Sequence, residues 1–313
     1  DGLDSIAMTK VDTVFIYNCT VLPNAPMNVP EYREKYKIKI ARSPIMLVHS
    51  SIHNRGDHQE YEEIVTETST CSHEDLKETY LYSWCFLTLQ SLGILKHIAT
   101  YYNMSHNILY TKFYEGFLEF CRNEESVFSE EVNHVIKFRD DGYAGKGWDE
   151  HDPKLGDIIW PIEEASWLRL SYNEKMFHRD ANRLIKFIDD KFGLNTSEKI
   201  LKDLVKFEVF TLSTRDNKNE IKSEKFNYDW KKYFLSEVDT RLTEIPIKYS
   251  YNNLVIDDDP ISWGFKAIWY GRRAGNYKCQ LQKLKEDDII IDNFKDSDSE
   301  KVIVETTHDT MGP

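Results

Sequence analysis

The stretch "SHEDLKETYLYSWCFLTLQSLGILKHIATYYN", residues 72–103, carries the clearest structural signal in the chain. Ser72 followed three positions later by Asp75 predicts a capping box, in which each side chain accepts the other residue's backbone N–H at a helix N-terminus. Apolar residues then recur at helical spacing, which predicts one buried face. We predict a long helix that continues to about Asn103. The residues of the predicted stripe are Leu76, Tyr80, Trp84, Leu87 and Ile94.

Further helices are expected downstream of this stretch. One starts near Thr111 and carries phenylalanines at helical spacing, and another covers about 129–139. After a glycine-rich connector at 140–157, helices resume at Pro161. They break near Ser171, continue to about Lys191, stop at Gly193 and restart after Ser197. We therefore predict a helical middle domain over residues 72–213.

The residues before the helical domain look like one step of an α/β repeat. Leu3, Ile6 and Ala7 share a helix face, and "VDTVFIYNCTVL" (11–22) reads as a strand buried on both faces of a parallel sheet. Pro30 opens a short helix, and two extended segments follow around 43–50 and 60–68. Because neither a cap nor an initiator Met precedes the first helix, we expect a truncated chain. Residues 1–71 are predicted to be the edge of a larger α/β sheet plus an extended linker.

The residues after the helical domain are predicted to form a small β-rich region over 214–313. "RDNKNEIKSEK" (215–225) reads as a charged loop, and strands are expected in "IPIKYSYNNLVI" (245–256), "GFKAIWYGRR" (264–273) and "NYKCQLQKLK" (276–285). A last strand is expected within "DSDSEKVIVETTHDTMGP" (296–313). The fold class predicted for the whole chain is therefore α+β.

The net charge of the chain indicates which partners it can bind, and its cysteines indicate in which cellular compartment it resides. A formal net charge of -13 opposes binding to nucleic acid or to an anionic membrane surface, since both require cations that face phosphates. Five scattered cysteines are typical of reduced thiols, which favours the cytoplasm. No apolar run approaches a membrane span, and the first residues do not resemble a signal peptide. We expect a soluble cytoplasmic protein with a small-molecule substrate.

The common enzyme motifs are absent from the sequence. It contains no CxxC, CxxxCxxC, GxGxxG, GxxxxGK[ST], GxSxG or HExxH. Cys85 and Cys121 fall within apolar helical patterns and are expected in the core, whereas Cys19 follows the predicted buried strand. A small buried thiol is the commoner case there, although Cys19 could line a site.

"WPIEEASWLRL" (160–170) holds the best candidate for acid–base chemistry. Glu163 and Glu164 are paired carboxylates, and such pairs serve as acid and base when their environments differ. Trp167 and Arg169 complete a possible substrate pocket. The competing interpretation is structural, because glutamates in a helix's first turn are favoured by the macrodipole alone. An independent hydrolase built on these glutamates and the histidines is a further hypothesis.

Two other groups of residues can be interpreted either as functional sites or as ordinary surface structure. The first group contains three histidines and two carboxylates: His49, His53, His58, Asp57 and Glu60. Side chains of these types suggest a zinc or iron site. Their spacing matches no standard metal-binding motif, however, and a polar surface loop also explains the group. "IWYGRRAGNYK" (268–278) places aromatic and cationic side chains together, which could stack on a sugar or base or pair with phosphate. An exposed basic tip of a strand pair is the alternative. The residues concerned are Trp269, Tyr270, Arg272 and Arg273.

Several segments together resemble a known family. "DTVFIYNCTVLPNAPMNVPEYREKYKIK" (12–39) resembles the last part of the catalytic barrel of cobalamin-binding-domain-containing radical S-adenosylmethionine (radical SAM) proteins. The segments at 60–102, 110–120 and 160–170 resemble, in the same order, landmarks of the helical region that follows that barrel. The resemblance covers roughly residues 12–170, and "AIWYGRRAG" (267–275) extends it.

The resemblance implies that this chain is the C-terminal portion of such an enzyme, cut before the sixth barrel strand. Its parent would hold a [4Fe-4S] cluster and S-adenosylmethionine, and cobalamin-dependent methyl transfer is one reaction that the resemblance implies. Because CxxxCxxC is absent, this chain is expected to bind none of these cofactors alone and to need the missing N-terminal portion as its partner. By match to the family's loop, Asn18, Leu22, Pro23 and Asn24 would lie near adenosine or substrate. The alternative is a stand-alone, non-catalytic helical binding module.

Overall fold

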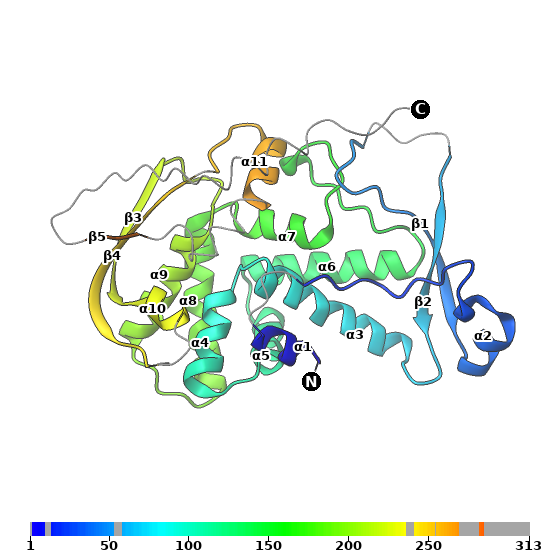
Figure 1. Ribbon diagram of the computed structural model, residues 1–313, viewed down its shortest axis with the longest axis horizontal. Helices are drawn as coiled ribbons and strands as arrows, with labels where there is room; N and C mark the ends of the chain where they lie inside the picture. The colour runs from blue at the N-terminus through cyan, green and yellow to red at the C-terminus, as the bar shows by residue number, and fades with distance from the viewer. Residues whose placement is uncertain are drawn as a thin grey trace.

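The protein is described by a computed structural model that covers residues 2–9, 14–52, 58–235, 241–253, 255–268 and 282–284. Its architecture is mixed: a helical body is flanked by two small antiparallel sheets, one at each end of the long axis (Figure 1). The described parts of the chain contain no closed barrel. The coarse α+β prediction is therefore confirmed.

The helical body is built from seven α-helices and one π-helical segment. The helices are α3 (His73–Trp84), α4 (Lys96–His106), α5 (Tyr110–Asn123), α6 (Val127–Tyr143), α7 (Ile162–Leu170), α8 (Glu174–Lys191) and α9 (Glu198–Thr211), and the π-helical segment is η2 (Cys85–Ser91). A short 3-10 turn, η3 (Pro153–Leu155), lies in the connector before α7. The predicted starts near 111 and after 161 and 197, and the break near Ser171, are all confirmed.

The capping box at Ser72 is confirmed, but the single long helix is wrong. The Ser72 hydroxyl accepts the Asp75 N–H at 3.2 Å, and the Asp75 carboxylate accepts the Ser72 N–H at 2.9 Å. The α-helix ends at Trp84, widens into η2, and breaks at Gly93, whose φ is +93°. That left-handed conformation suits glycine and interrupts the helical ladder, so α4 starts in a new direction.

The N-terminal residues form α1 (Gly2–Met8), η1 (Pro26–Asn28), α2 (Pro30–Tyr36) and the antiparallel pair β1 (Lys39–Pro44) and β2 (Tyr61–Glu67). The prediction of a strand buried on both faces is wrong for the described residues 14–22. Phe15 is 65% and Tyr17 is 82% exposed, and the segment joins the sheet only at the bridge between Thr20 and Ile64. A strand becomes buried on both faces only when other elements cover it, and none of the described residues does so here.

The C-terminal region contains β3 (Ile221–Tyr228), β4 (Glu244–Asn252) and β5 (Gln282–Leu284) in the order β3-β4-β5, with α10 (Trp230–Leu235) and α11 (Pro260–Lys266). The strand predicted at 245–256 is confirmed. Two other predictions are wrong: part of the expected charged loop forms β3, and residues 264–266 belong to α11 rather than to a strand. Pro260 at the first helical position and Asp259 as N-cap explain that helix. The strand expected near the end of the chain lies outside the described residues.

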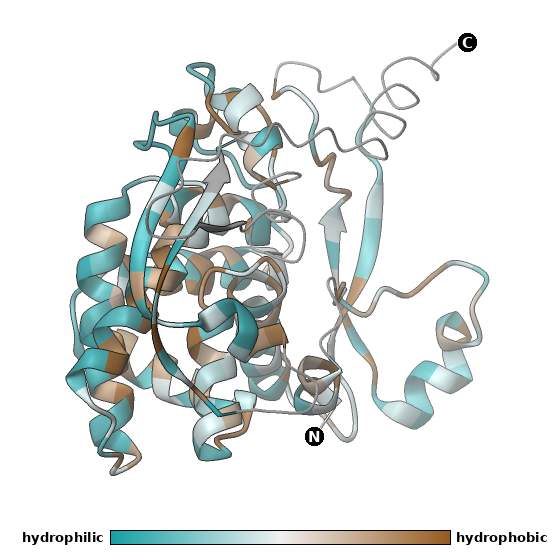
Figure 2. Ribbon diagram, turned by 60° about the vertical axis from the view of Figure 1, so that its left-hand side comes forward, coloured by the Kyte–Doolittle hydropathy of each residue, from teal (hydrophilic) through white to brown (hydrophobic). Residues whose placement is uncertain are grey.

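One buried cluster joins these elements, with members from Ala7 to Ile268. Apolar residues gather inside the helical body and polar residues cover its outer faces (Figure 2). Large aromatic side chains fill the centre because each buries much apolar area, and the fully buried tryptophans are Trp84, Trp160, Trp167, Trp230 and Trp263. None of the helices in the described ranges combines the length and the apolar composition that a bilayer crossing demands.

Candidate functional site

The first turn of α7 brings Glu163 and Glu164 to the surface of the helical body. Pro161 precedes the helix with an extended backbone, φ -57° and ψ 141°, so the chain enters α7 from an extended segment. That segment is fixed on both sides, because Trp160 N–H donates to the Glu150 carbonyl at 2.9 Å and Ile159 N–H donates to the Ser50 carbonyl at 2.9 Å. Both glutamates therefore stand on a rigid support.

His49 approaches this turn from the segment that follows β1. Its Nε2 lies 2.7 Å from the Glu164 carboxylate, and its ring meets the rings of Trp160 and Phe265 edge-on at 5.6 and 5.4 Å between centroids. Its backbone N–H donates to the Ile159 carbonyl at 2.7 Å. The φ of His49 is +60°, a left-handed conformation that is uncommon outside glycine and often found at functional positions.

Glu163 is the unusual member of this cluster. Its carboxylate makes no hydrogen bond or ion pair with another described residue. Burial raises its pKa; its own backbone N–H acts in the opposite direction, the neighbouring Glu164 raises the pKa further, and His49 lowers it. Burial raises the pKa of Tyr80, and the charge of Glu163 raises it further. The Tyr80 ring packs against Trp148, with 5.2 Å between the ring centroids.

The two glutamates thus have different environments in the same helical turn. Glu164 is paired with an imidazole, whereas Glu163 is half-buried, has a raised pKa and lacks a donor from another described residue. Such an arrangement can hold a proton on one carboxyl group and a negative charge on the other. It can also accept hydrogen bonds from a ligand that supplies the missing donor. We name His49, Glu163 and Glu164 the α7 cluster.

Trp167 and Arg169 lie farther along α7 in packed surroundings. Trp167 is 1% exposed, and its indole N–H donates to the Leu92 carbonyl at 3.0 Å. Arg169 binds Glu131 through two hydrogen bonds of 2.6 and 2.8 Å and Glu150 through one of 2.6 Å. Burial alone would lower the pKa of Arg169, but the hydrogen bonds and charges of the two glutamates raise it. Both side chains hold α7 in place.

The loop residues expected near a cofactor occupy a different part of the surface. Asn18 is half-buried, and Leu22, Pro23 and Asn24 are exposed. The loop is fixed from behind, because Asn28 Nδ2 donates to the Pro23 carbonyl at 2.8 Å and Asn28 in turn accepts a hydrogen bond from Arg33. Among the interactions of the described residues, none joins this loop to the α7 cluster.

The proposed histidine and carboxylate metal site finds no support in the described part of the chain. There, no three His, Cys, Asp or Glu side chains come together as metal ligands. His53 and Asp57 lie outside the described residues, as do Trp269, Tyr270, Arg272 and Arg273. Cys85 and Cys121 are buried, and burial raises the pKa of both thiols, which disfavours the thiolate that an iron–sulfur cluster requires. The described residues therefore do not fit a cluster, and no reaction step involves one here.

The sequence did not reveal the contact between His49 and Glu164. The two residues are 115 positions apart, and each appeared in a separate motif. A further network was also missed: Glu131 accepts from Ser166 at 2.7 Å and binds Arg169, and Glu150 pairs with His134 at 2.9 Å. No local spacing predicts such contacts, because they join different helices.

Comparison with known proteins gives two distant relatives, and no family model matches the chain. The chain is 21% identical over 256 residues to the cobalamin-dependent radical SAM methyltransferase TokK of Streptomyces tokunonensis. It is 22% identical over 255 residues to the 2-(S-pantetheinyl)-carbapenam-3-carboxylate methyltransferase of Streptantibioticus cattleyicolor. Each match covers 75% of this chain and 36% of the relative.

The chain is therefore distantly similar to one cobalamin-dependent radical SAM methyltransferase and to a second methyltransferase. It spans about a third of the length of these curated relatives, at 36% of each. The family resemblance seen in the sequence is supported at this coarser level.

Replacing Glu163 with methionine is expected to stabilise the isolated chain by about 1 kcal/mol at pH 7, because an apolar side chain of similar size avoids burying a carboxylate without a partner. The wild-type pKa is raised on folding, so the folded protein binds more protons than the unfolded one above the usual carboxyl range. The contribution of Glu163 to stability therefore falls as the pH rises through that interval. Urea unfolding between pH 4 and 8 should show that the stability of Glu163→Met relative to the wild type increases with pH.

Glu164→Met is the matched control for this prediction. It removes the neighbouring carboxylate, which has His49 as a partner, and it should give no stabilisation. Equal gains in both variants would contradict the assignment of Glu163 as the unsatisfied group.

Proposed function

We propose that this chain is the C-terminal portion of a radical SAM enzyme, in which residues 1–71 close the catalytic barrel and the α7 cluster shapes the substrate pocket. In this proposal residues 72–213 form the helical domain and residues 214–313 a small β-rich addition. The parent enzyme would carry the [4Fe-4S] cluster, S-adenosylmethionine and, for methyl transfer, cobalamin. The missing N-terminal portion would supply the cluster's cysteine ligands.

The exposure of large apolar side chains near the N-terminus carries this proposal. Met8, Phe15, Tyr17 and Leu22 are 58%, 65%, 82% and 61% exposed, and they exceed every other large apolar side chain of the described residues. Phe15 and Tyr17 stack with their centroids 6.2 Å apart and point to the same face. Figure 2 shows the extended segment that leads toward α2 as an apolar stretch outside the helical body. Apolar patches of this kind are typical of a surface that another protein part covers.

The backbone of the same segment supports the proposal. Val21 N–H donates to the Glu63 carbonyl at 2.7 Å, and Val65 N–H donates to the Cys19 carbonyl at 2.8 Å, so residues 19–21 extend the β1-β2 sheet. No other described strand lies beyond this segment. An uncovered sheet edge is a template for pairing, and strands of the missing barrel would pair there.

The α7 cluster is proposed to recognise the substrate. Glu163 lacks a hydrogen-bond donor from any other described residue, and a substrate N–H, O–H or ammonium group would supply it. His49 and its aromatic neighbours Trp160 and Phe265 would hold Glu164 in position beside it. The proposed role is binding and orientation, and no electron or methyl transfer is assigned to these residues.

This proposal can be tested with a longer protein that also includes the residues encoded in frame upstream of Asp1. After anaerobic reconstitution with iron and sulfide it should show the visible absorption of a thiolate-bound cluster. With dithionite as the one-electron donor it should cleave S-adenosylmethionine to methionine and a 5'-deoxyadenosyl radical, which takes a hydrogen atom from the substrate or the buffer to give 5'-deoxyadenosine. Glu163→Gln in that longer protein should keep both properties and lower substrate methylation by at least about tenfold, as expected for the loss of a positioning contact. The exposed-site variant Glu198→Gln, on α9, is the control and should retain full activity.

A stand-alone binding module is the second candidate, favoured by the single core that joins the chain from Ala7 to Ile268. An upstream reading frame without a CxxxCxxC motif, or a reconstituted product without cluster absorption, would support this candidate and contradict the first.

A further inference from the structure

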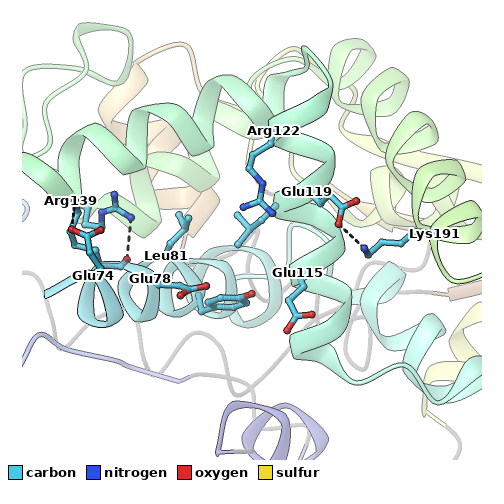
Figure 3. A pocket seen from close by; sticks show the side chains of 11 residues that line it. Glu74, Glu78, Leu81, Glu115, Glu119, Arg122, Arg139 and Lys191 are labelled. Carbon is cyan, nitrogen blue, oxygen red and sulfur yellow. Dashed lines mark hydrogen bonds and ion pairs between the residues drawn. The ribbon is translucent and has the colours of Figure 1, made fainter. Parts of the chain in front are cut away.

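A groove of about 450 Å³ lies between α3 and α5, away from the α7 cluster (Figure 3). Both helices pack against α6, which forms the back of the groove. The α3 wall presents Glu78, Leu81 and Tyr82. The α5 wall presents Glu115, Leu118 and Arg122. The volume of the groove lies within the range of roughly 300–1,000 Å³ that is usual for small-molecule sites.

Most charged side chains around the groove already have partners. Lys191 pairs with Glu119 at 2.6 Å and Lys77 with Glu74 at 3.5 Å. Glu115 is bound by the exposed Lys112 at 2.8 Å. The Lys191 and Lys77 pairs need no ligand, whereas the Lys112 and Glu115 side chains are 55% and 41% exposed, so solvent screens this pair and Glu115 can also face a bound cation.

Glu78 and Arg122 differ from these pairs. Neither side chain makes a hydrogen bond or an ion pair with another described residue. They stand on opposite walls of the groove, Glu78 on α3 and Arg122 on α5 (Figure 3). Within the described residues, the groove therefore offers one carboxylate and one guanidinium without partners, and the charges of both act on Tyr82.

The environment of Tyr82 connects these charges. Burial first, and then the charges of Glu115 and Glu78, raise the pKa of Tyr82 to about 12 against the opposing charge of Arg122, so all three charges act on one phenol group. Two carboxylates beside an aromatic ring are a favourable setting for an ammonium group. Each helix also places two glutamates one turn apart, at 74 and 78 and at 115 and 119, and a bound cation would offset that like-charge repulsion.

We propose that this groove binds a zwitterion of the size of an amino acid or dipeptide. The ammonium group would lie against Tyr82 between Glu78 and Glu115, and the carboxylate would bind the Arg122 guanidinium. An apolar side chain would pack on Leu81 and Leu118. This site does not rest on the proposed radical SAM role, because its lining includes no residue of the α7 cluster.

Calorimetric titration of this chain with three probes tests the proposal. The probes are L-leucyl-glycine, its N-acetyl derivative, which lacks the ammonium charge, and its methyl ester, which lacks the carboxylate. The free dipeptide should bind at least about fivefold more tightly than either derivative, because each derivative loses one charged contact. Equal affinity for all three probes, or no binding of the dipeptide, overturns the proposal.

Two variants test which residue of the groove contacts each charged group of the dipeptide. Arg122→Gln should weaken the dipeptide about fivefold and leave the methyl ester unchanged, and Glu78→Gln should weaken the dipeptide and leave the N-acetyl derivative unchanged. Lys175→Gln and Glu34→Gln make the same charge changes at exposed positions outside the groove and should have no effect. All four positions are on exposed helix surfaces, so circular dichroism should show unaltered folding. Equal effects of the groove variants and their controls would also overturn the proposal.

Discussion

Arg169→Met should lower the free energy of unfolding by about 3–5 kcal/mol, the cost of breaking a buried ion pair by removing one partner. Arg169 lies between two buried carboxylates, Glu131 and Glu150, which are 5% and 6% exposed in their side chains. Without the guanidinium both would remain buried with too little compensating charge. Urea unfolding monitored by tryptophan fluorescence measures this loss.

The same network makes the effect of Arg169→Met depend on pH. Burial opposes ionisation of Glu150, but its hydrogen bond to His134 and the charge of Arg169 outweigh burial and lower its pKa. A carboxyl whose pKa is lowered on folding contributes stability above its unfolded pKa and loses that contribution as the pH falls. The difference between wild type and Arg169→Met should therefore shrink below about pH 4, where carboxyl groups are protonated.

Lys199→Met is the control for the Arg169 variant. Lys199 pairs with Glu244 on the surface, where the two side chains are 47% and 58% exposed. Solvent screens such a pair, so its removal should leave the unfolding midpoint unchanged. A loss in Arg169→Met no larger than in this control would contradict the structural role of the network. Because the network fixes α7, the α7 cluster should also be displaced in Arg169→Met.

Asp203→Leu should cost about 3–4 kcal/mol, because it leaves one buried and two half-buried donors without their acceptor. Asp203 is 4% exposed on α9, and it accepts from Asn227 N–H at 3.0 Å, from the Asn227 side chain at 2.9 Å and from the Trp230 indole at 2.9 Å. These contacts fasten β3 and α10 to the helical body. Hydrogen exchange should show that β3 and β4 lose protection before α5 and α8 do.

Two further variants, Asp203→Asn and Glu198→Leu, show how much of this loss of stability comes from the hydrogen bonds of Asp203. Asparagine keeps one acceptor oxygen, so Asp203→Asn should cost less than Asp203→Leu. Glu198→Leu removes an exposed one-turn pair with Lys202 on the same helix and should not change the protection of β3. Uniform loss of protection across the helical body and the sheet in Asp203→Leu would contradict a local fastening role.

The sequence by itself determined the helical body. Capping at Ser72, the apolar spacing of α5 and the stops near Ser171 and Gly193 are local features, since each depends on residues within one or two turns. Their physical causes act before distant parts of the chain meet, so the starts of α3, α5, α7 and α9 could be predicted closely, whereas the break between α3 and α4 was missed. The charge and the absent motifs were likewise properties of the sequence alone.

Only the tertiary structure decided the α7 cluster and the state of residues 14–22. His49 meets Glu164 because two distant segments pair through backbone hydrogen bonds at Ile159, and no residue spacing encodes that contact. The apolar pattern of residues 14–22 is that of a buried strand, yet burial depends on what packs against a segment. Among the described residues nothing covers Phe15 and Tyr17, so the same side chains that predicted a core strand form an exposed edge.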